Sequence, residues 1–441
     1  MGRRKKPLPT EPVTVVIESM SHDGRGVVRL DGKATFIRGA LPGEKVEFLY
    51  TRKHRKRDEG RCINVLEASP ERVEPKCAHF GLCGGCSLQH QAVDRQIHAK
   101  AEVLKDNLER LGSVQPETWL KPLTGPHWRY RHKARLGVKY VFKKEKLLVG
   151  FREAGTSKVA DLSVCEVLHP SVGHRLIQLR ALINDMEARE RIPQIEVAVG
   201  DRHAALIFRH LDPLSDADRQ ALRAFAAHYD LDIFLQPGGP DTVTPLNPGA
   251  ERTLSYRLPE WGVEVAFRPD DFTQVNTALN RAMVARALDL LDLRPGDRVL
   301  DLFCGLGNFT LPMARQGAEV VGVEGDEGLV VRARENAQRN GVTQVEYHAA
   351  DLTHDQSEAP WMSGRYDKIL LDPPRSGALE MLPLIARLAP KRIVYVSCHP
   401  GSLARDAGCL VKEHGYRLVK AGVMDMFPHT AHVESIALFE Q

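Results

Sequence analysis

The sequence predicts an α/β protein whose C-terminal part is a Rossmann-like domain, preceded by a small β-barrel and a central α+β region. From about residue 269 onward, near-continuous apolar strands alternate with helices, which is typical of a parallel sheet covered on both faces. Before residue 70, short strands and turn signals follow each other closely, which predicts an OB-like barrel. We therefore expect domains at 1–70, 71–268 and 269–441, with a helix at 92–112 that packs on the last domain.

The composition is that of a globular chain without a membrane segment. Hydrophobic residues make up 43% and charged residues 27% of the 441 residues. No apolar run approaches the roughly 20 residues that a membrane helix needs, and the basic start at Met1–Pro7 lacks the apolar stretch of a secretory signal. We expect a cytoplasmic protein with no membrane partner, whose eight cysteines serve metal binding or catalysis rather than disulfides.

Positive charge is concentrated near the N-terminus. Residues 1–76 contain 17 Lys and Arg against 11 Asp and Glu, whereas the remaining residues contain 44 against 46. The densest run is Arg52–Arg57, which reads Arg-Lys-His-Arg-Lys-Arg. A solvated loop is one interpretation of this run, but a basic run on a small barrel better fits contact with an RNA backbone.

A glycine-containing turn follows the first strand of the C-terminal domain. It reads Asp301-Leu-Phe-Cys-Gly-Leu-Gly-Asn-Phe309, and glycines between a strand and a helix let the backbone approach a ligand closely. The next strand ends in Glu324, which can bind both ribose hydroxyls of an adenosine, and Asp351 can reach the adenine edge. Since there is no phosphate cradle and no Gly-Lys-Ser/Thr, the sequence favours S-adenosylmethionine over a nicotinamide dinucleotide.

Two further strands end in groups that suit covalent catalysis. One is followed by Asp372-Pro-Pro-Arg375, and the other ends in Ser397-Cys-His-Pro400. Cys398 is either an inert packed residue or, at such a strand end, a nucleophile. A thiolate that adds to carbon 6 of uracil activates carbon 5 toward a methyl sulfonium, and a base must then remove the carbon-5 proton. Glu434 could be that base, or only an exposed acid at the start of the final strand.

The segment Trp128–Arg135 alternates aromatic and basic side chains. In an extended conformation its four cations would share one face. The four are Arg129, Arg131, Lys133 and Arg135. This pattern fits phosphate pairing and base stacking on single-stranded RNA, although an ordinary strand with one wet face gives the same pattern. The target base would have to flip out of any stack to reach Cys398.

Together with His432-Val-Glu434, these motifs resemble those of the RNA uracil-5 methyltransferases, over nearly the whole chain. The resemblance implies that Cys398 is the nucleophile, that Glu434 is the base, and that S-adenosylmethionine is the methyl donor. It also implies the residues that line the donor and target-base site. These are Gln274, Phe303, Asn308, Glu324, Asp351 and Asp372. His399 stands where the family has asparagine, which leaves any role of that position open.

Within the family, the chain resembles the bacterial enzymes that carry a TRAM domain and an iron–sulfur cluster. The N-terminal strands correspond to the TRAM domain. This resemblance implies 23S ribosomal RNA as the partner, with the uracil-1939 site as the target. The sequence gives no sign of an obligate protein partner. The residues alone leave open which ribosomal or transfer RNA uridine is modified.

Four cysteines form a candidate metal site, three in one glycine-rich segment and one far downstream. They are Cys77, Cys83, Cys86 and Cys165. Four thiolates can hold zinc or a [4Fe–4S] cluster, and three close cysteines with one distant favour iron–sulfur, as does the resemblance. Cys62 is the competing fourth ligand. The spacing is not that of radical enzymes, so we expect no redox chemistry, and we expect Cys304 and Cys409 to be packed structural residues.

Two other functions compete with this interpretation. RNA cytosine-5 methylation uses a second cysteine after a proline, where this chain has Asp372-Pro-Pro-Arg375. A non-catalytic RNA-binding assembly factor would not need Cys398, Glu434 and Glu324, all of which are present.

Overall fold

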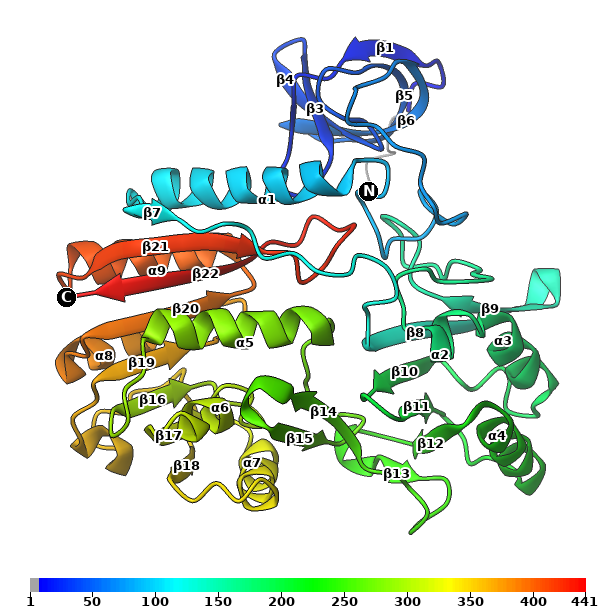
Figure 1. The fold of residues 1–441 in the computed structure, drawn as a ribbon. Helices are drawn as coiled ribbons and strands as arrows, with labels where there is room; N and C mark the ends of the chain where they lie inside the picture. The colour runs from blue at the N-terminus through cyan, green and yellow to red at the C-terminus, as the bar shows by residue number, and fades with distance from the viewer. Residues whose placement is uncertain (1–7) are drawn as a thin grey trace, which may run out of the picture. The chain divides into compact units, whose positions relative to one another are not determined.

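The computed structural model describes residues 8–441 (Figure 1). The basic start at Met1–Pro7 therefore lies outside the described residues. The described chain divides into two compact units. Unit 1 comprises the residues up to Lys100 with Glu153–Thr156 and Pro428–His432, and unit 2 comprises Ala101–Arg152, Ser157–Phe427 and Val433–Gln441.

Unit 1 contains a six-stranded sheet with the order β1-β5-β6-β4-β3-β2. Its strands are β1 (Val13–Val16), β2 (Ser19–Met20), β3 (Gly26–Leu30), β4 (Lys33–Arg38), β5 (Lys45–Lys53) and β6 (Arg57–Glu67). Alternate side chains face one apolar core, in which Ile17, Ile37 and Phe48 are fully buried. Asp31 and Gly32 join β3 to β4 with positive φ values of 51° and 76°, as a type I′ hairpin turn requires.

The first strand of unit 1 changes neighbours along its length. β1 pairs with β5, and β2, which follows after Ile17 and Glu18, pairs with β3. Between them, Ile17 N donates to Glu44 O and Glu18 N donates to Val27 O, each at 2.9 Å. One continuous segment therefore connects the two ends of the sheet.

The rest of unit 1 is a turn-rich loop followed by the start of α1 (Val93–Asn107). The buried Gln96 holds this part together. Its Nε2 donates to Leu88 O at 2.9 Å and to Gln91 O at 2.7 Å, and its Oε1 accepts from His429 N at 2.8 Å. The segment that leads into the last strand of the chain is thereby fixed within unit 1.

Unit 2 contains an eight-stranded sheet with the order β18-β17-β16-β19-β20-β22-β21-β7. Its strands are β7 (Thr118–Trp119), β16 (Arg298–Leu302), β17 (Glu319–Glu324), β18 (Val345–Ala349), β19 (Lys368–Leu371), β20 (Arg392–Ser397), β21 (Arg417–Met424) and β22 (Glu434–Glu440). The strands from β18 to β20 are parallel, and β22 is antiparallel to both of its neighbours. The predicted α/β fold with a parallel sheet is confirmed.

Helices cover the two faces of this sheet (Figure 1). They are α5 (Thr277–Leu291), α6 (Thr310–Arg315), α7 (Glu327–Arg339), α8 (Leu382–Leu388) and α9 (Pro400–Lys412), with 3₁₀ turns η5 (Pro360–Ser363) and η6 (Leu379–Met381). After α1, the π-helical turn η1 (Leu108–Gly112) ends at the predicted stop. A Cβ on Gly112 would lie 2.5 Å from Ala404 O in α9, so the glycine lets η1 pack directly on that helix.

A second six-stranded sheet, with the order β13-β12-β11-β10-β8-β9, forms the other half of unit 2. Its strands are β8 (Lys133–Val141), β9 (Lys146–Gly150), β10 (Gln194–Val199), β11 (Ala204–Arg209), β12 (Leu231–Gln236) and β13 (Thr244–Pro245). Its helices are α2 (Pro170–Gly173), α3 (Leu176–Asp185) and α4 (Asp216–Tyr229), with 3₁₀ turns η2 (Phe142–Lys144), η3 (Pro240–Thr242) and η4 (Pro259–Trp261). The hairpin of β14 (Leu254–Leu258) and β15 (Val263–Phe267) shares its apolar core with the large sheet. Among residues 8–441, no helix combines the length and apolarity needed to cross a membrane.

Candidate active site

The strand order of the large sheet reverses between β16 and β19. From β16 the sheet extends through β17 and β18 on one side, and from β19 it extends through β20 on the other. Such a reversal opens a crevice beyond the carboxyl ends of parallel strands, where ligands bind. β22 runs antiparallel to β20, so its first residue lies at the same edge. Six of the predicted site residues are found at this edge. They are Phe303, Glu324, Asp351, Asp372, Cys398 and Glu434.

The turn after β16 is shaped for the close approach of a ligand. Phe303, Gly305 and Gly307 have positive φ values of 65°, 54° and 92°. A Cβ on Gly305 would meet no heavy atom within 4 Å, whereas one on Gly307 would lie 2.9 Å from Tyr347 Oη. Gly305 therefore leaves the main chain accessible, and Gly307 lets the turn pack against β18.

Glu324, the last residue of β17, is oriented by the main chain. Its Oε2 accepts a hydrogen bond from Gly305 N at 3.0 Å, and its Oε1 accepts from Gly325 N at 2.8 Å and from Asp326 N at 3.1 Å. A carboxylate has about four lone-pair positions, so one of them remains for a ribose hydroxyl. The carboxylate is thus set beside the glycine turn before any ligand binds.

Asp351 lies just beyond β18 and is exposed. Its Oδ1 accepts from Thr353 Oγ1 at 2.7 Å and from Thr353 N at 3.0 Å, and its Oδ2 lies 2.9 Å from His354 Nδ1. The bonds from Thr353, and then the contact with His354, lower the pKa of Asp351. Asp351 is therefore an ionised acceptor at neutral pH, which suits the amino group of an adenine.

Asn308 and Gln274 differ in how they are held. Asn308 Oδ1 accepts from Tyr256 Oη and from Asn280 Nδ2, both at 2.9 Å, and its Nδ2 donates to Asn280 Oδ1 at 3.0 Å. These bonds fix the end of the glycine turn against α5 and β14. Gln274 is half-buried before α5, and its amide has no hydrogen-bond partner among residues 8–441. Of the two, Gln274 is the freer to contact a ligand.

Two carboxyl groups lie beneath the crevice. Asp301 is fully buried and Asp372 is partly buried. Burial raises the pKa of each to about 7, and the charge of Glu324 adds to the effect. Thr310 Oγ1 donates to Asp301 Oδ2 at 2.5 Å, but Asp301 Oδ1 has no partner among the described residues. A buried oxygen without a partner is costly, so Asp301 is a further candidate for contact with a ligand.

Sequence analysis did not single out Asp301, Tyr256 or Asn280 as site residues. For Asp301 a signal exists, because it is the one acid in the strand Arg298–Leu302, which is otherwise apolar after its first residue. For Tyr256 and Asn280 no local signal exists. Their contact with Asn308 depends on how a hairpin and a helix pack, which only the fold reveals.

Cys398 and Glu434 face each other across β20 and β22. The last pair of the ladder is Ser397 opposite Ser435, and continuing the antiparallel register places Cys398 opposite Glu434. Glu434 is 3% exposed, so the alternative of an exposed acid at a strand start is wrong. A thiol and a buried carboxylic acid thus meet at the edge where the crevice opens.

The surroundings of Cys398 disfavour its thiolate in the free protein. Burial raises the pKa of Cys398 to about 11, and the charges of Glu434 and Asp372 contribute to the increase. Arg375 acts in the opposite direction. The arginine of the Asp372-Pro-Pro-Arg375 turn is therefore the group that makes the thiol more acidic.

His399 caps the helix that follows the cysteine. Its Nδ1 accepts a hydrogen bond from Ser402 N at 3.1 Å, at the N-terminus of α9. Ser397 Oγ accepts from His399 N at 3.2 Å and donates to His399 O at 3.1 Å. Asparagine is itself a strong N-cap residue, so the exchange of asparagine for histidine preserves this function. Hydrogen bonds of His399 with Ser397 and with Ser402 therefore hold the turn that carries Cys398.

The prediction that the four cations of Trp128–Arg135 share one face of an extended segment is wrong. Arg129 has a left-handed φ of 58°, which interrupts the alternation. Lys133 Nζ donates to Pro269 O at 2.5 Å and to Asp271 O at 2.6 Å. Burial lowers the pKa of Lys133 to about 8. Lys133 thereby anchors the loop that carries Gln274.

The cysteines of the candidate metal site divide between the units. In unit 1, Cys77, Cys83 and Cys86 are partly exposed thiols of one loop, and Gly85 N donates to Cys83 Sγ at 3.3 Å. In unit 2, Cys165 is buried. Cys62, the competing ligand, lies on β6 and packs against the apolar core of the unit 1 sheet.

His90, in the same loop region of unit 1, is a buried imidazole. It is 1% exposed, its ring lies 5.3 Å from that of Phe80, and neither ring nitrogen has a partner among the described residues. Burial lowers the pKa of His90 to about 4, so the ring is neutral. One of its ring nitrogens therefore carries an N–H that has no acceptor among the described residues.

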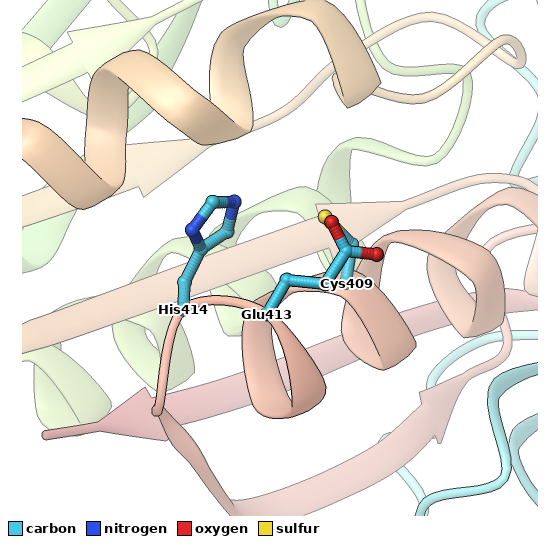
Figure 2. A group of neighbouring side chains, drawn as sticks. All are labelled: Cys409, Glu413 and His414. Atoms are coloured by element: carbon cyan, nitrogen blue, oxygen red, sulfur yellow. The ribbon is translucent and has the colours of Figure 1, made fainter.

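Cys409, Glu413 and His414 form another group of metal-binding side chains (Figure 2). Their donor atoms lie within 4.8 Å of one another at the C-terminal end of α9. Cys398 precedes the other end of this helix, and a helix of that length spans about 20 Å. A metal held here would not reach the reacting atoms. Cys409 is partly exposed, in contrast to the expected packing, whereas Cys304 is buried as expected.

The basic run Arg52–Arg57 lies at the tip of the β5–β6 hairpin of unit 1. All of its side chains are exposed, and Lys53 pairs with Asp58 across the hairpin. Lys53 Nζ lies 4.2 Å from the centre of the Tyr50 ring. The run is therefore an exposed hairpin tip, with the Tyr50 ring packed under Lys53.

Comparisons with known proteins agree with this geometry. The tRNA (uracil-5-)-methyltransferase family model matches residues 92–441, and the TRAM domain model matches residues 10–52. A relative from Xanthomonas axonopodis pv. citri, 23S rRNA (uracil(1939)-C(5))-methyltransferase RlmD, is 58% identical over 444 residues and is covered completely, as is this chain. The protein of the same name from Alkalilimnicola ehrlichii is 55% identical over 441 residues, which cover 100% of this chain and 99% of the relative.

A solved structure resembles almost the entire fold. It is the Pyrococcus abyssi tRNA (uracil-54, C5)-methyltransferase in complex with S-adenosyl-L-homocysteine. The likeness covers 97% of this chain and 100% of that chain, with a TM-score of 0.75 and 24% identity. At this level of identity the comparison shows a shared fold.

Proposed function

Because the chain belongs to the tRNA (uracil-5-)-methyltransferase family, we propose that it methylates carbon 5 of a uridine in 23S ribosomal RNA. The full-length relatives at 55% and 58% identity are named for that reaction at uracil 1939, and we assign the same target. The observation that carries the proposal is the position of Cys398 opposite the buried Glu434. Since ribosomal RNA is the substrate, we place the reaction in the cytoplasm.

The crevice of the large sheet would bind the methyl donor. When bound, S-adenosylmethionine supplies an electrophilic methyl group on a positively charged sulfonium. Glu324 would accept a hydrogen bond from a ribose hydroxyl beside the open main chain of Gly305, and Asp351 would accept one from the adenine amino group. The remaining residues would complete the donor and target-base site. They are Gln274, Phe303, Asn308 and Asp372.

Cys398 would act as the nucleophile. Its thiolate forms a bond to carbon 6 of the flipped uracil, and the electron pair of the carbon 5–carbon 6 double bond moves into an enolate. Carbon 5 then takes the methyl group, and the electron pair of the broken bond stays on the donor sulfur. The positive charge of a bound methyl donor would stabilise the thiolate of Cys398, as the positive charge of Arg375 does.

Glu434 would act as the base that ends the reaction. Its carboxylate takes the proton from the methylated carbon 5, and the electron pair of that bond restores the double bond. The bond from carbon 6 to Cys398 then breaks, and the thiolate leaves with its electron pair. The position of Glu434 supports this role, because its buried carboxylate lies opposite Cys398, next to where the adduct would form.

We further propose a [4Fe–4S] cluster held by Cys77, Cys83, Cys86 and Cys165. The amide of Gly85 that donates to Cys83 Sγ fits a sulfur ligated to iron, and the orphaned N–H of His90 would have an acceptor in a sulfide. The packing of Cys62 in the sheet core supports Cys165 as the fourth ligand. Such a cluster supplies four ligand bonds that cross-link the loop, with no part in methyl transfer.

We also propose that the unit 1 sheet is an OB-like TRAM barrel that binds RNA, followed by a central iron–sulfur domain at 71–268 and the catalytic domain at 269–441. The match to the TRAM domain and the continuous segment from β1 to β2, which connects both ends of the sheet, support the barrel. The basic hairpin tip at Arg52–Arg57 supports contact with phosphates.

A covalent adduct tests the chemistry. A 23S ribosomal RNA fragment with 5-fluorouridine at the target should trap the wild-type protein, because fluorine blocks loss of a proton from carbon 5. Cys398→Ala should form no adduct and still bind S-adenosylmethionine, whereas the matched variant Cys409→Ala should form the adduct normally. An adduct with Cys398→Ala would refute the mechanism. Preferential modification of transfer RNA would refute the choice of 23S ribosomal RNA.

A further inference from the structure

The hairpin of β8 and β9 in unit 2 presents an aromatic ring to solvent. Its turn, η2, begins with Phe142, whose side chain is 64% exposed. Of the exposed large hydrophobic side chains among residues 8–441, only Phe272, at 70%, is more exposed. The hairpin can be followed from the labelled strands in Figure 1.

The structure holds this ring in place from beneath. Val141 pairs with Lys146 across the hairpin, and Glu145, with a φ of 47°, closes the turn by donating its N–H to Phe142 O at 3.2 Å. The ring of Tyr140 meets that of Phe142 edge to face, with their centres 5.3 Å apart. The Arg189 guanidinium in turn lies 5.3 Å from the centre of the Tyr140 ring. One edge of the Phe142 ring is therefore backed by Tyr140, while the rest of the ring is exposed to solvent.

Several lysines lie close to Phe142 in the sequence of the hairpin. Lys139, Lys143 and Lys144 are exposed and form no ion pair with any residue of the part that the structure describes. Lys146, also exposed, is paired with Asp161, and Glu145 is the one acid within the hairpin tip. The tip therefore carries a surplus of positive charge around an exposed aromatic face.

We propose that this tip is an RNA-binding site separate from the catalytic crevice, in which Phe142 stacks on an unpaired base while Lys143 and Lys144 contact phosphates. Single-stranded RNA offers both a π-face and a regular anionic backbone, which an exposed ring beside lysines fits. A protein partner fits less well, because lysine is depleted in protein interfaces. The inference rests on the proposed RNA substrate and adds a contact outside the residues that the family resemblance implies.

Substitution of the ring gives the first test. The probe is a 23S ribosomal RNA fragment that contains the target uridine and its neighbouring loops. Phe142→Ala should weaken binding about tenfold, within the range expected for loss of one stacked base. Phe142→Trp should keep wild-type affinity, and Phe142→Leu, which keeps apolar area but no ring, should resemble the alanine variant. Leu211→Ala, which changes another exposed apolar side chain, is the control and should bind normally.

Substitution of the lysines gives the second test. The double variant Lys143→Gln and Lys144→Gln should reduce the slope of log affinity against log salt by about 1.4, which corresponds to two phosphate contacts on a single strand. Lys412→Gln, at an exposed lysine in the last turn of α9, should leave the slope unchanged. The unfolding temperature of each variant should match that of the wild type, which checks that the variant is folded.

Four results would overturn the site or separate it from the proposed function. Normal RNA affinity of Phe142→Ala would overturn it. So would a wild-type dimer that Phe142→Ala converts to monomers with unchanged RNA binding, because the tip would then be a protein interface. If the wild type methylates 23S ribosomal RNA and Phe142→Ala has the same KM, the site fails and the function stands. If no variant methylates this RNA but the binding defect of Phe142→Ala persists, the function fails and the site stands.

Discussion

At the scale of single residues, Glu434 is the group whose role the fold clarifies most. The sequence places it at a strand start, where an acid is ordinarily exposed, but the register with β20 buries it opposite Cys398. Cys398 itself could be predicted, because strand ends of parallel sheets converge on one edge. Glu434 could be assigned only through the family resemblance, since its burial depends on strand pairing across the sheet.

Glu434→Gln should separate the two halves of the reaction. The amide cannot take a proton, so the variant should add Cys398, transfer the methyl group and then stop. Denaturing gels and mass spectrometry should detect a protein–RNA adduct that carries the extra methyl group. Glu346→Gln, at an acid of β18 outside the crevice edge, is the control and should turn over normally. Normal turnover by Glu434→Gln would place the base elsewhere.

The reaction should accelerate with pH, because the pKa of Cys398 is about 11 and the thiol is protonated at neutral pH. The thiolate fraction then increases about tenfold per pH unit below that value. Asp372, with a pKa of about 7, gains its charge between pH 6 and 8 and opposes the thiolate, so the increase should be steepest above pH 8. Single-turnover rates from pH 6.5 to 9 measure this profile.

Arg375→Gln should shift the same profile toward higher pH. Loss of the positive charge raises the pKa of Cys398 further and lowers the rate at any fixed pH in this range. Arg387→Gln, at an exposed arginine in the last turn of α8, serves as the control. A flat profile for the wild type, or an unchanged one for Arg375→Gln, would show that thiolate formation does not limit the rate.

At the scale of elements, the helices and strands around the crevice followed from sequence pattern, but local geometry within segments did not. The alternation in Trp128–Arg135 suggested one continuous strand, whereas β8 begins only at Lys133 because Arg129 turns the chain. Lys133 is drawn inward by two carbonyl oxygens of a loop more than a hundred residues away. Periodicity cannot detect such a long-range contact.

The N-cap of α9, His399, should affect the methylation rate as well as stability, because it holds the turn that carries Cys398. His399→Asn should preserve the cap and the activity. His399→Ala should lose it, reduce stability by about 1 kcal/mol and slow methylation, because the turn that carries Cys398 loosens. Ser215→Ala removes the comparable cap of α4 and should cost similar stability without affecting the rate. Equal rates for both alanine variants would show that the cap has only a structural role.

The basic tip of the β5–β6 hairpin should supply affinity rather than chemistry. We expect neutralisation of four cations to reduce the salt slope of RNA binding by at least about 1.4, or two contacts. The four substitutions are Arg52→Gln, Lys53→Gln, Arg55→Gln and Lys56→Gln. The rate at saturating RNA should stay unchanged, since the crevice lies in unit 2. A slow rate at saturation, or methylation of another uridine, would mean that the hairpin positions the RNA.

At the scale of the whole molecule, the α/β sheet and its site edge could be predicted, because buried parallel strands read as apolar runs separated by helices. The division of the chain into two units could not be predicted from the sequence. Pro428–His432 belongs to unit 1 although the strands on either side of it belong to unit 2. The reason is that His429 N donates a hydrogen bond to the side chain of Gln96 in unit 1. Such a division depends on contacts between distant segments, which composition and linker signals do not reveal.

The metal content of the intact chain tests the proposed [4Fe–4S] cluster. Protein purified without oxygen should be brown and contain about four iron atoms per chain, as one four-cysteine cluster requires. Cys83→Ser should lose most of the iron, whereas Cys409→Ser should keep it. His90→Leu, which removes the unpaired N–H, should keep the fold but release iron faster to a chelator. Stoichiometric zinc without iron would contradict the cluster.

The most direct test of the central claim is to map the methylated nucleotide by mass spectrometry. Purified protein, S-adenosylmethionine and an unmodified 23S ribosomal RNA transcript should yield 5-methyluridine at uracil 1939. Under the same conditions Cys398→Ala should yield none. Methylation of a cytosine, or of the transcript by Cys398→Ala, would contradict the account.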